Sequence, residues 1–258
     1  MLAADEESGY GESEGGGLLS TLLLLLIGFF IVNFFVQIYR KPTEILRWAG
    51  LSRAKTTEQT WREYGDDFRR NGRGVITADF LAALSQLESS GDPLASPGWT
   101  FRWSTSPWRI YAPASSAVGL LQMTDGNYGA ARDMAGGGLY SRLVGSHSIE
   151  MTSAFLHHHV RRIVAGLRRP IALRDQQKLA AVMHLCGPGK GLAMVRANFN
   201  AEALGSCGSQ PVGAYVRVVM RYRSQFARLA EAEDSRARGW MARFGASRPA
   251  WNGAPSRL

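Results

Sequence analysis

The longest apolar run of the chain covers residues 18–39, which include no charged side chain. Five consecutive leucines are followed by Phe29, Phe30, Phe34 and Phe35, so a helix here has no polar face. A helix of this length extends ~33 Å at ~1.5 Å per residue, which is enough to cross a bilayer core. The run therefore predicts one transmembrane helix. A buried core helix is the alternative, and a cleaved signal peptide is disfavoured because no basic segment precedes the run.

Beyond this run, apolar positions follow helical spacing. Thr77 can cap a helix that continues to Glu88, and Gly91 and Pro93 end it. Since convincing period-2 alternation is lacking, we expect a mainly α protein. Further helices are expected at about 117–134, 148–167, 174–186, 190–198 and 212–232.

The chain is long enough for an anchor and one domain with its own core. Residues 1–17 are acidic and rich in Gly and Ser, and we expect them to be disordered. The remaining segments are a transmembrane helix at 18–39, a juxtamembrane helical linker at 40–70, a folded domain at 71–232 and a basic flexible tail at 233–258.

Charge is distributed unevenly along the chain. The first 39 residues hold five acids and no base, which leaves the rest with a net charge of +14. Such a surface attracts polyanions, whether nucleic acid, anionic lipid or the acidic polymers of a bacterial envelope. No metal site is expected, because Cys186 and Cys207 lack zinc-ligand spacing and the triplet His157–His159 cannot place three ligands on one helical face.

The segment Leu87-Glu88-Ser89-Ser90-Gly91-Asp92-Pro93 ends a helix with a carboxylate about one turn before the break. Apolar walls around such a carboxyl raise its pKa and keep it protonated, as a general acid requires. The alternative is a solvated surface glutamate. Asp92 is either a turn residue before the proline or a hydrolase-style second carboxylate.

A second segment, Ser115-Ser116-Ala117-Val118-Gly119-Leu120-Leu121-Gln122-Met123-Thr124, starts with small residues. These residues and Gly119 permit close backbone approach, and the Gln122 amide can bond a sugar hydroxyl or N-acetyl group. Glu88 is therefore a candidate catalytic acid. The substrate-binding candidates in these segments are Ser89, Ser115, Ser116, Gly119, Gln122 and Met123.

The two segments resemble the soluble lytic transglycosylase family over residues 76–229. Its pattern is a Glu-Ser pair closing a helix, then Asn-Pro, then Gly-Leu-Met-Gln. The resemblance implies a lysozyme-like α domain with Glu88 as acid/base and Gln122 in the cleft. Direct matches are Glu88, Ser89, Pro93, Gly119, Leu120 and Gln122.

The family's third signature, Ala-Tyr-Asn-Ala-Gly-Pro-Gly, corresponds to Met183-His184-Leu185-Cys186-Gly187-Pro188-Gly189. His184 therefore stands at the position of the family's cleft tyrosine, and Leu185 at that of its asparagine. An imidazole can donate a hydrogen bond as a phenol does, and it titrates near neutrality. Tyr215 resembles the tyrosine of the family's closing Tyr-Val helix. His184 and Tyr215 complete the substrate-binding candidates.

By this resemblance, the chain is expected to cleave the bond between N-acetylmuramic acid and N-acetylglucosamine in peptidoglycan glycan strands. A single acid and no cofactor suffice, because the sugar's own C6 hydroxyl attacks C1 and gives a 1,6-anhydro product. The alternatives are a hydrolytic muramidase, a catalytically weak glycan-binding or scaffold module of an envelope-spanning complex with protein partners, and a nucleic-acid binder. Nucleic acid is not expected, because no recognised motif for it is present.

An aromatic-rich loop separates the two segments. Trp99, Phe101, Trp103, Trp108 and Tyr111 are expected either to stack on sugar faces or to form a satellite hydrophobic cluster that pins the loop.

The expected location is the bacterial inner membrane, with a single pass and the domain outside the cytoplasm. Cys186 and Cys207 should then form a disulfide. The bases that follow the span argue for the opposite orientation under the positive-inside rule. They are Arg40, Lys41, Arg47, Arg53 and Lys55.

Overall fold

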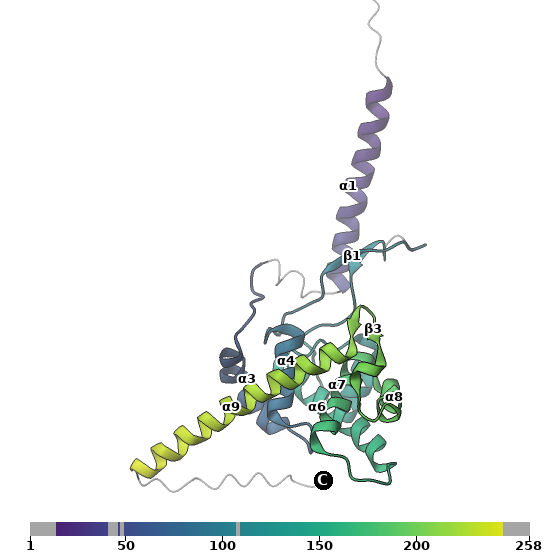
Figure 1. Ribbon diagram of the computed structural model, residues 1–258. Coiled ribbons are helices and arrows are strands. Elements are labelled where there is room, and N and C mark those ends of the chain that lie inside the picture. The colour runs from purple at the N-terminus through teal and green to yellow at the C-terminus, as the bar shows by residue number, and fades with distance from the viewer. Residues whose placement is uncertain (1–13, 41–45, 47–48, 107–108, 245–258) are drawn as a thin grey trace, which may run out of the picture. The chain divides into compact units, whose positions relative to one another are not determined.

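The computed structural model describes residues 14–40, 46, 49–106 and 109–244 (Figure 1). Two compact units are present within this part of the chain. The first combines the N-terminal helix with residues 98–114, and the second combines residues 46–97 with the chain from 115 onward. Helices dominate, and the strands form two short antiparallel pairs, so the predicted mainly α class is confirmed.

The first unit contains helix α1 (Glu14–Arg40) and a hairpin of strands β1 (Trp99–Phe101) and β2 (Tyr111–Pro113). Within α1, residues 17–39 are long and apolar enough to cross a membrane, and the protein buries only 6% of the most apolar window. The predicted apolar helix is therefore present. It begins at Glu14, inside the segment expected to be disordered, and residues 1–13 lie outside the described part.

The sequence did not predict this hairpin, because we interpreted its segment as an aromatic-rich loop. Its register pairs Trp99 with Pro113 and Phe101 with Tyr111. Strands of three residues are too short to show a period-2 pattern, and the aromatic side chains that stabilise this pair pack on α1. Trp108 lies outside the described residues.

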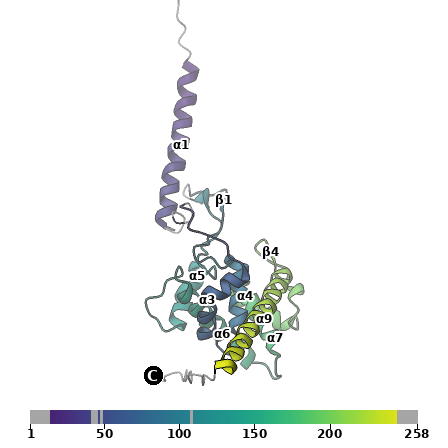
Figure 2. The ribbon, with the colours of Figure 1, turned by 90° about the vertical axis from the view of Figure 1, so that its left-hand side faces the viewer.

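The second unit is built mainly from helices, with α4 packed against both α3 and α9 (Figure 2). Two 3-10 turns, the short helix α8 and a β-hairpin connect α7 to α9. The elements are α3 (Thr57–Asn71), α4 (Ala78–Ser89), α5 (Asp125–Met134), α6 (Gly145–Ala165), α7 (Leu173–Cys186), η2 (Pro188–Lys190), α8 (Gly191–Arg196), η3 (Ala201–Leu204), β3 (Ser206–Cys207), β4 (Gln210–Pro211) and α9 (Val212–Phe244).

Helix α4 forms the centre of this core. Its residues Phe80, Leu81 and Leu84 are fully buried, together with Phe68 of α3 and Phe226 of α9. Burial of a large apolar side chain stabilises a fold by about 1.5–3 kcal/mol. The last turn of α4, which carries Glu88, is therefore held by a rigid element.

Helix α3 lies in the stretch that we expected to be a linker between membrane and domain. Instead, Trp61, Tyr64 and Phe68 place one face of α3 in the core. Its start is fixed by a capping box, in which Thr56 accepts from the Gln59 N–H and the Gln59 side chain accepts from the Thr56 N–H. The folded unit therefore begins before residue 71.

Helix α9 continues past residue 232, where we expected a flexible tail. Glu233 explains the extension: its Oε2 accepts a hydrogen bond from Trp61 Nε1 at 2.8 Å and pairs with Arg69 Nη2 at 2.5 Å. The tail prediction is thus wrong for residues 233–244, and residues 245–258 lie outside the described part.

Candidate active site

Glu88 lies in the last turn of α4, and its side chain is 19% exposed. The helix ends because Ser90 and Gly91 adopt positive φ angles of 52° and 72°. Their N–H groups bond back to the Gln86 and Ser85 carbonyls at 3.1 and 3.4 Å. The break predicted from Gly91 and Pro93 is confirmed, and it leaves the carboxyl at a well-ordered helix end.

Two further candidates, His184 and Tyr215, meet Glu88 at one oxygen. The Tyr215 hydroxyl, from the first turn of α9, donates a hydrogen bond to Glu88 Oε1. His184 Nε2, from the last turn of α7, lies 3.5 Å from the same atom. Both side chains are largely buried. Since both contacts use Oε1, Oε2 is engaged by neither of them.

The pKa of Glu88 differs from the value that the sequence led us to expect. Burial raises this pKa, but the hydrogen bond and positive charge of His184 lower it, and the Tyr215 hydrogen bond lowers it further. The net pKa is below the ordinary value for glutamate, so the predicted elevation is wrong. Burial and the Glu88 charge raise the pKa of Tyr215 well above 10, so the phenol keeps its proton and remains a donor.

The segment 115–124 folds as a tight turn rather than as the predicted start of a helix. Gly119 and Gln122 have φ angles of 85° and 45°, and an isolated bridge joins Val118 to Met123. A Cβ on Gly119 would lie 2.0 Å from the Arg142 carbonyl oxygen, so only glycine fits here. Helix α5 therefore begins at Asp125.

Ser89 and Gln122, both expected to touch substrate, hold this turn in place. Ser89 Oγ lies 2.7 Å from the Leu120 carbonyl oxygen and 2.9 Å from that of Ser85. Gln122 Nε2 donates to the carbonyls of Ala95 and Gly119, each at 2.8 Å. These groups connect the turn to α4 and to the loop after it, so they position the segment beside Glu88.

The other residues predicted in this turn have separate places. Ser116 Oγ accepts the Asp125 N–H at 3.0 Å and so supports the start of α5, whereas Ser115 is exposed. Met123 is a core residue. The structure thus brings Glu88, His184 and Tyr215 together and assigns Ser116 and Met123 to the framework around them.

Arg142 is a positioning residue that the sequence did not reveal. Its Nη1 donates to the Met123 and Ser116 carbonyls at 2.9 and 3.3 Å, and its Nη2 pairs with Asp125 Oδ1 at 2.7 Å. The arginine therefore holds both ends of the turn. No local motif marks it, because its partners lie about 20 residues earlier in the chain.

Asp92 adopts the first of its two predicted roles, that of a turn residue. It is 5% exposed, and its Oδ1 accepts the Leu94 N–H at 2.9 Å. The hydroxyl of Ser52 donates to Oδ2. Both oxygens thus serve the loop that follows α4.

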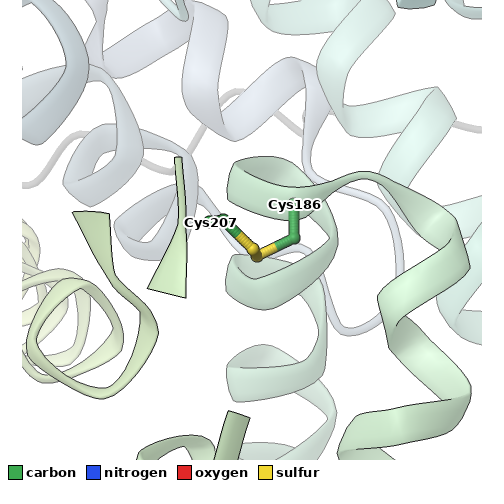
Figure 3. The surroundings of a disulfide bond; sticks show 2 residues. All are labelled: Cys186 and Cys207. Carbon is green, nitrogen blue, oxygen red and sulfur yellow. A yellow bond between two sulfur atoms is a disulfide. The ribbon is translucent and has the colours of Figure 1, made fainter. Parts of the chain in front are cut away.

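A disulfide bond joins Cys186 to Cys207, as predicted, with 5.5 Å between the Cα atoms (Figure 3). Cys186 ends α7, two residues after His184, and Cys207 lies in β3, shortly before α9 and Tyr215. The bond therefore connects α7, which supplies His184, to the strand that shortly precedes α9 and Tyr215.

No group of three or more His, Cys, Asp or Glu side chains within the described residues is placed to hold a metal ion. No family model matches the chain, and a search of curated proteins gives no match. The function therefore has to be argued from the site and from the sequence segments that build it.

Proposed function

We propose that the chain is a membrane-anchored lytic transglycosylase that cleaves the bond between N-acetylmuramic acid and N-acetylglucosamine in peptidoglycan, through a lysozyme-like domain. The observation that carries the proposal is the convergence of Glu88, His184 and Tyr215 at one carboxylate. These positions are the ones that the resemblance to soluble lytic transglycosylases assigns to the acid/base and two cleft residues. They come from three helices, so their convergence is not a consequence of sequence proximity.

In the proposed reaction, protonated Glu88 gives its proton to the glycosidic oxygen while the bond from C1 to that oxygen breaks. The resulting carboxylate takes the proton of the sugar's C6 hydroxyl, whose oxygen bonds to C1. Glu88 ends protonated, water is not consumed, and the product carries a 1,6-anhydro ring. The nucleophile belongs to the substrate, and its high effective concentration reduces the need for a second protein carboxylate.

The low pKa of Glu88 in the free site favours its role as a base. A sugar bound over the carboxyl excludes water and so disfavours its charged form, which raises the pKa towards the value needed for the acid step. Oε2 is the oxygen proposed to face the glycosidic bond, because Oε1 is held by Tyr215 and His184.

Helix α1 is proposed to anchor the chain in a bacterial inner membrane. Its apolar window is almost unburied by protein, which supports contact with lipid. The disulfide supports a domain outside the cytoplasm, since such bonds persist in oxidising compartments. This argument opposes the positive-inside rule, and the disulfide is the observation that favours the external side.

The experiment is digestion of purified murein by the full chain in detergent micelles, in ¹⁸O-labelled water, followed by mass spectrometry. We expect 1,6-anhydro ends without label, and no products from the matched Glu88→Gln protein. Labelled reducing ends would identify a hydrolytic muramidase. Retention on murein without cleavage would identify a binding or scaffold module, and salt-dependent retention on DNA instead would favour a nucleic-acid binder.

A further inference from the structure

One face of the C-terminal half of α1 is covered by protein, although the helix has the composition of a membrane span. Asn33 and Gln37 are 0% and 5% exposed, whereas the leucines at 22–26 are 53–69% exposed. Asn33 and Gln37 are four residues apart and therefore share a helix face. Polar side chains in an apolar helix usually face protein rather than lipid.

The β1–β2 hairpin packs on α1 at Asn33 and at the neighbouring rings of Phe30 and Phe34. The ring of Phe30 lies 6.2 Å from those of Phe101 and Tyr111, and Phe34 stacks on Trp99 at 6.2 Å. Asn33 Nδ2 donates a 2.7 Å hydrogen bond to the Tyr111 carbonyl oxygen. The hairpin thus packs along the helix by ring contacts and is fixed in register by one amide.

Beyond these contacts the hairpin presents large apolar side chains to its surroundings. Phe101 is 67% exposed and Trp103 is fully exposed. Arg102, whose Nη2 donates to the Ala114 carbonyl, and Arg109 are also exposed. Exposed aromatic rings with arginines nearby in the chain are typical of protein segments at a membrane–water interface. There the rings enter the boundary of the acyl chains, and the cations contact lipid phosphates. Helix α1 likewise exposes large apolar side chains, among them Leu24 at 69% and Phe35 at 64%.

The hydrogen-bonding groups of the hairpin backbone limit how deep in the bilayer the hairpin can lie. Each strand of a two-stranded hairpin turns backbone N–H and C=O groups outward, and such groups need hydrogen-bond partners that hydrocarbon chains do not offer. Its partner Phe30 precedes the end of α1 by about ten residues, or ~15 Å. The boundary of the hydrocarbon layer therefore falls near Asn33. About 16 residues of the span, or ~24 Å, remain before it, which is shorter than a typical hydrocarbon core of ~30 Å. The bilayer must therefore thin locally around α1.

We infer that the β1–β2 hairpin, in its described residues 99–106 and 109–113, is a membrane-interface element that lies in the headgroup layer against α1 and contacts phospholipid through Phe101 and Trp103. The inference rests on the proposed membrane anchor. Of the two roles that the sequence left open for these aromatic rings, it replaces stacking on glycan with contact to lipid.

The test places one fluorophore at a time on the full chain in phospholipid vesicles. Leu24→Cys reports the span, Trp103→Cys the hairpin, and Leu139→Cys, 102% exposed on the second unit, is the matched control. Each protein is labelled without reduction, so that the native disulfide remains closed. Quenching is measured with nitroxide lipids labelled at the headgroup, at a shallow acyl position and at a deep one.

We expect position 24 to be quenched most by the deep nitroxide, and position 103 by the headgroup and shallow nitroxides, several-fold more than position 139. If position 24 is not quenched, the proposed anchor fails. If position 24 is quenched but 103 resembles 139, or if murein rather than lipid alters the signal at 103, the inference is overturned. Deepest quenching at 103 would also overturn it, because the hairpin would then lie within the hydrocarbon.

Discussion

The imidazole of His184 faces the carboxylate of Glu88 with 3.5 Å between Nε2 and Oε1. Burial of Glu88 favours the neutral acid, while the imidazole favours the carboxylate, and the second effect, helped by Tyr215, prevails in the free site. The histidine therefore sets the protonation state of the proposed acid/base. A tyrosine, which the resemblance leads one to expect at this position, would donate a hydrogen bond without the charge.

Replacement of the histidine should raise the pKa of Glu88. His184→Gln removes a cation that stabilises the carboxylate, so Glu88 stays protonated to higher pH. Because the acid step needs the protonated form, the alkaline limb of the pH–activity profile should move upward. The pKa itself is measured by carbon NMR of the Glu88 carboxyl. His158→Gln, on the exposed face of α6, is the control, and an unchanged Glu88 titration in His184→Gln would contradict the prediction.

Removal of the Tyr215 hydroxyl should also raise the pKa of Glu88, but by less than the loss of His184 does. In Tyr215→Phe the Glu88 pKa rises by less than in His184→Gln, because the imidazole contributes both a hydrogen bond and a charge. The loss of a hydrogen bond to a charged group should also reduce the free energy of unfolding by about 1.5–3 kcal/mol. Chemical denaturation at neutral pH measures it, with Tyr222→Phe on the same helix as control. Equal free energies of unfolding for Tyr215→Phe and Tyr222→Phe would argue against the hydrogen bond between Tyr215 and Glu88.

Glu88→Gln should reduce murein cleavage by about 10²–10⁴-fold or more, the usual contribution of general acid–base catalysis. The amide keeps the size of the side chain but cannot transfer the proton. Circular dichroism should show an unchanged fold, and Glu231→Gln, an exposed substitution on α9, should digest murein at the wild-type rate. Comparable rates for Glu88→Gln and the parent chain would exclude Glu88 as the catalytic residue.

The sequence predicted the elements whose signals are local. Helix α4 was placed correctly because Thr77, the apolar spacing and Gly91 lie within about 15 residues, and Glu88 follows from the same segment. His184 and Tyr215, the two substrate-binding candidates that contact Glu88, were found only through their resemblance to a family pattern. Their convergence on Oε1 depends on the packing of α7 and α9 against the core and has no local signature.

The errors share a physical cause, which is long-range contact. The pKa of Glu88 was misjudged because burial could be inferred from its neighbours in sequence, whereas His184 lies about 100 residues away. Glu233 extends α9 through contacts with α3, and the aromatic hairpin is stabilised by α1. Local propensity and hydrophobic periodicity do not reveal contacts between residues that are far apart in the chain.

The turn beside Glu88 should tolerate no side chain at Gly119. Alanine there requires a positive φ and brings Cβ to 2.0 Å from the Arg142 backbone oxygen, so Gly119→Ala should destabilise the fold by more than ~1 kcal/mol. Gly126 lies in α5 with open space around its Cα, and Gly126→Ala should instead raise stability by up to ~1 kcal/mol. Thermal unfolding of the pair should therefore show shifts of opposite sign, and a neutral Gly119→Ala would contradict the predicted clash with the Arg142 carbonyl.

Loss of the Cys186–Cys207 bond should weaken both the fold and the site. The closed loop, with a sequence separation of 21, contributes about 3 kcal/mol in a chain-entropy treatment, against ~5–15 kcal/mol for a whole domain. The double variant Cys186→Ser with Cys207→Ser should therefore melt at a lower temperature. Because the bond ties the end of α7, which carries His184, to the strand that precedes α9 and Tyr215, the Glu88 pKa should also move back towards its ordinary value.

Reduction of the wild-type chain should reproduce both effects, whereas the double variant should not respond to reductant. Alkylation of protein from intact cells, denatured without prior reduction, reports where the domain lies. Protection of both cysteines until reduction supports an oxidising compartment. Free labelling of both would remove the disulfide and with it the chemical argument for the external side, and the bases that follow the span would then place the domain in the cytoplasm.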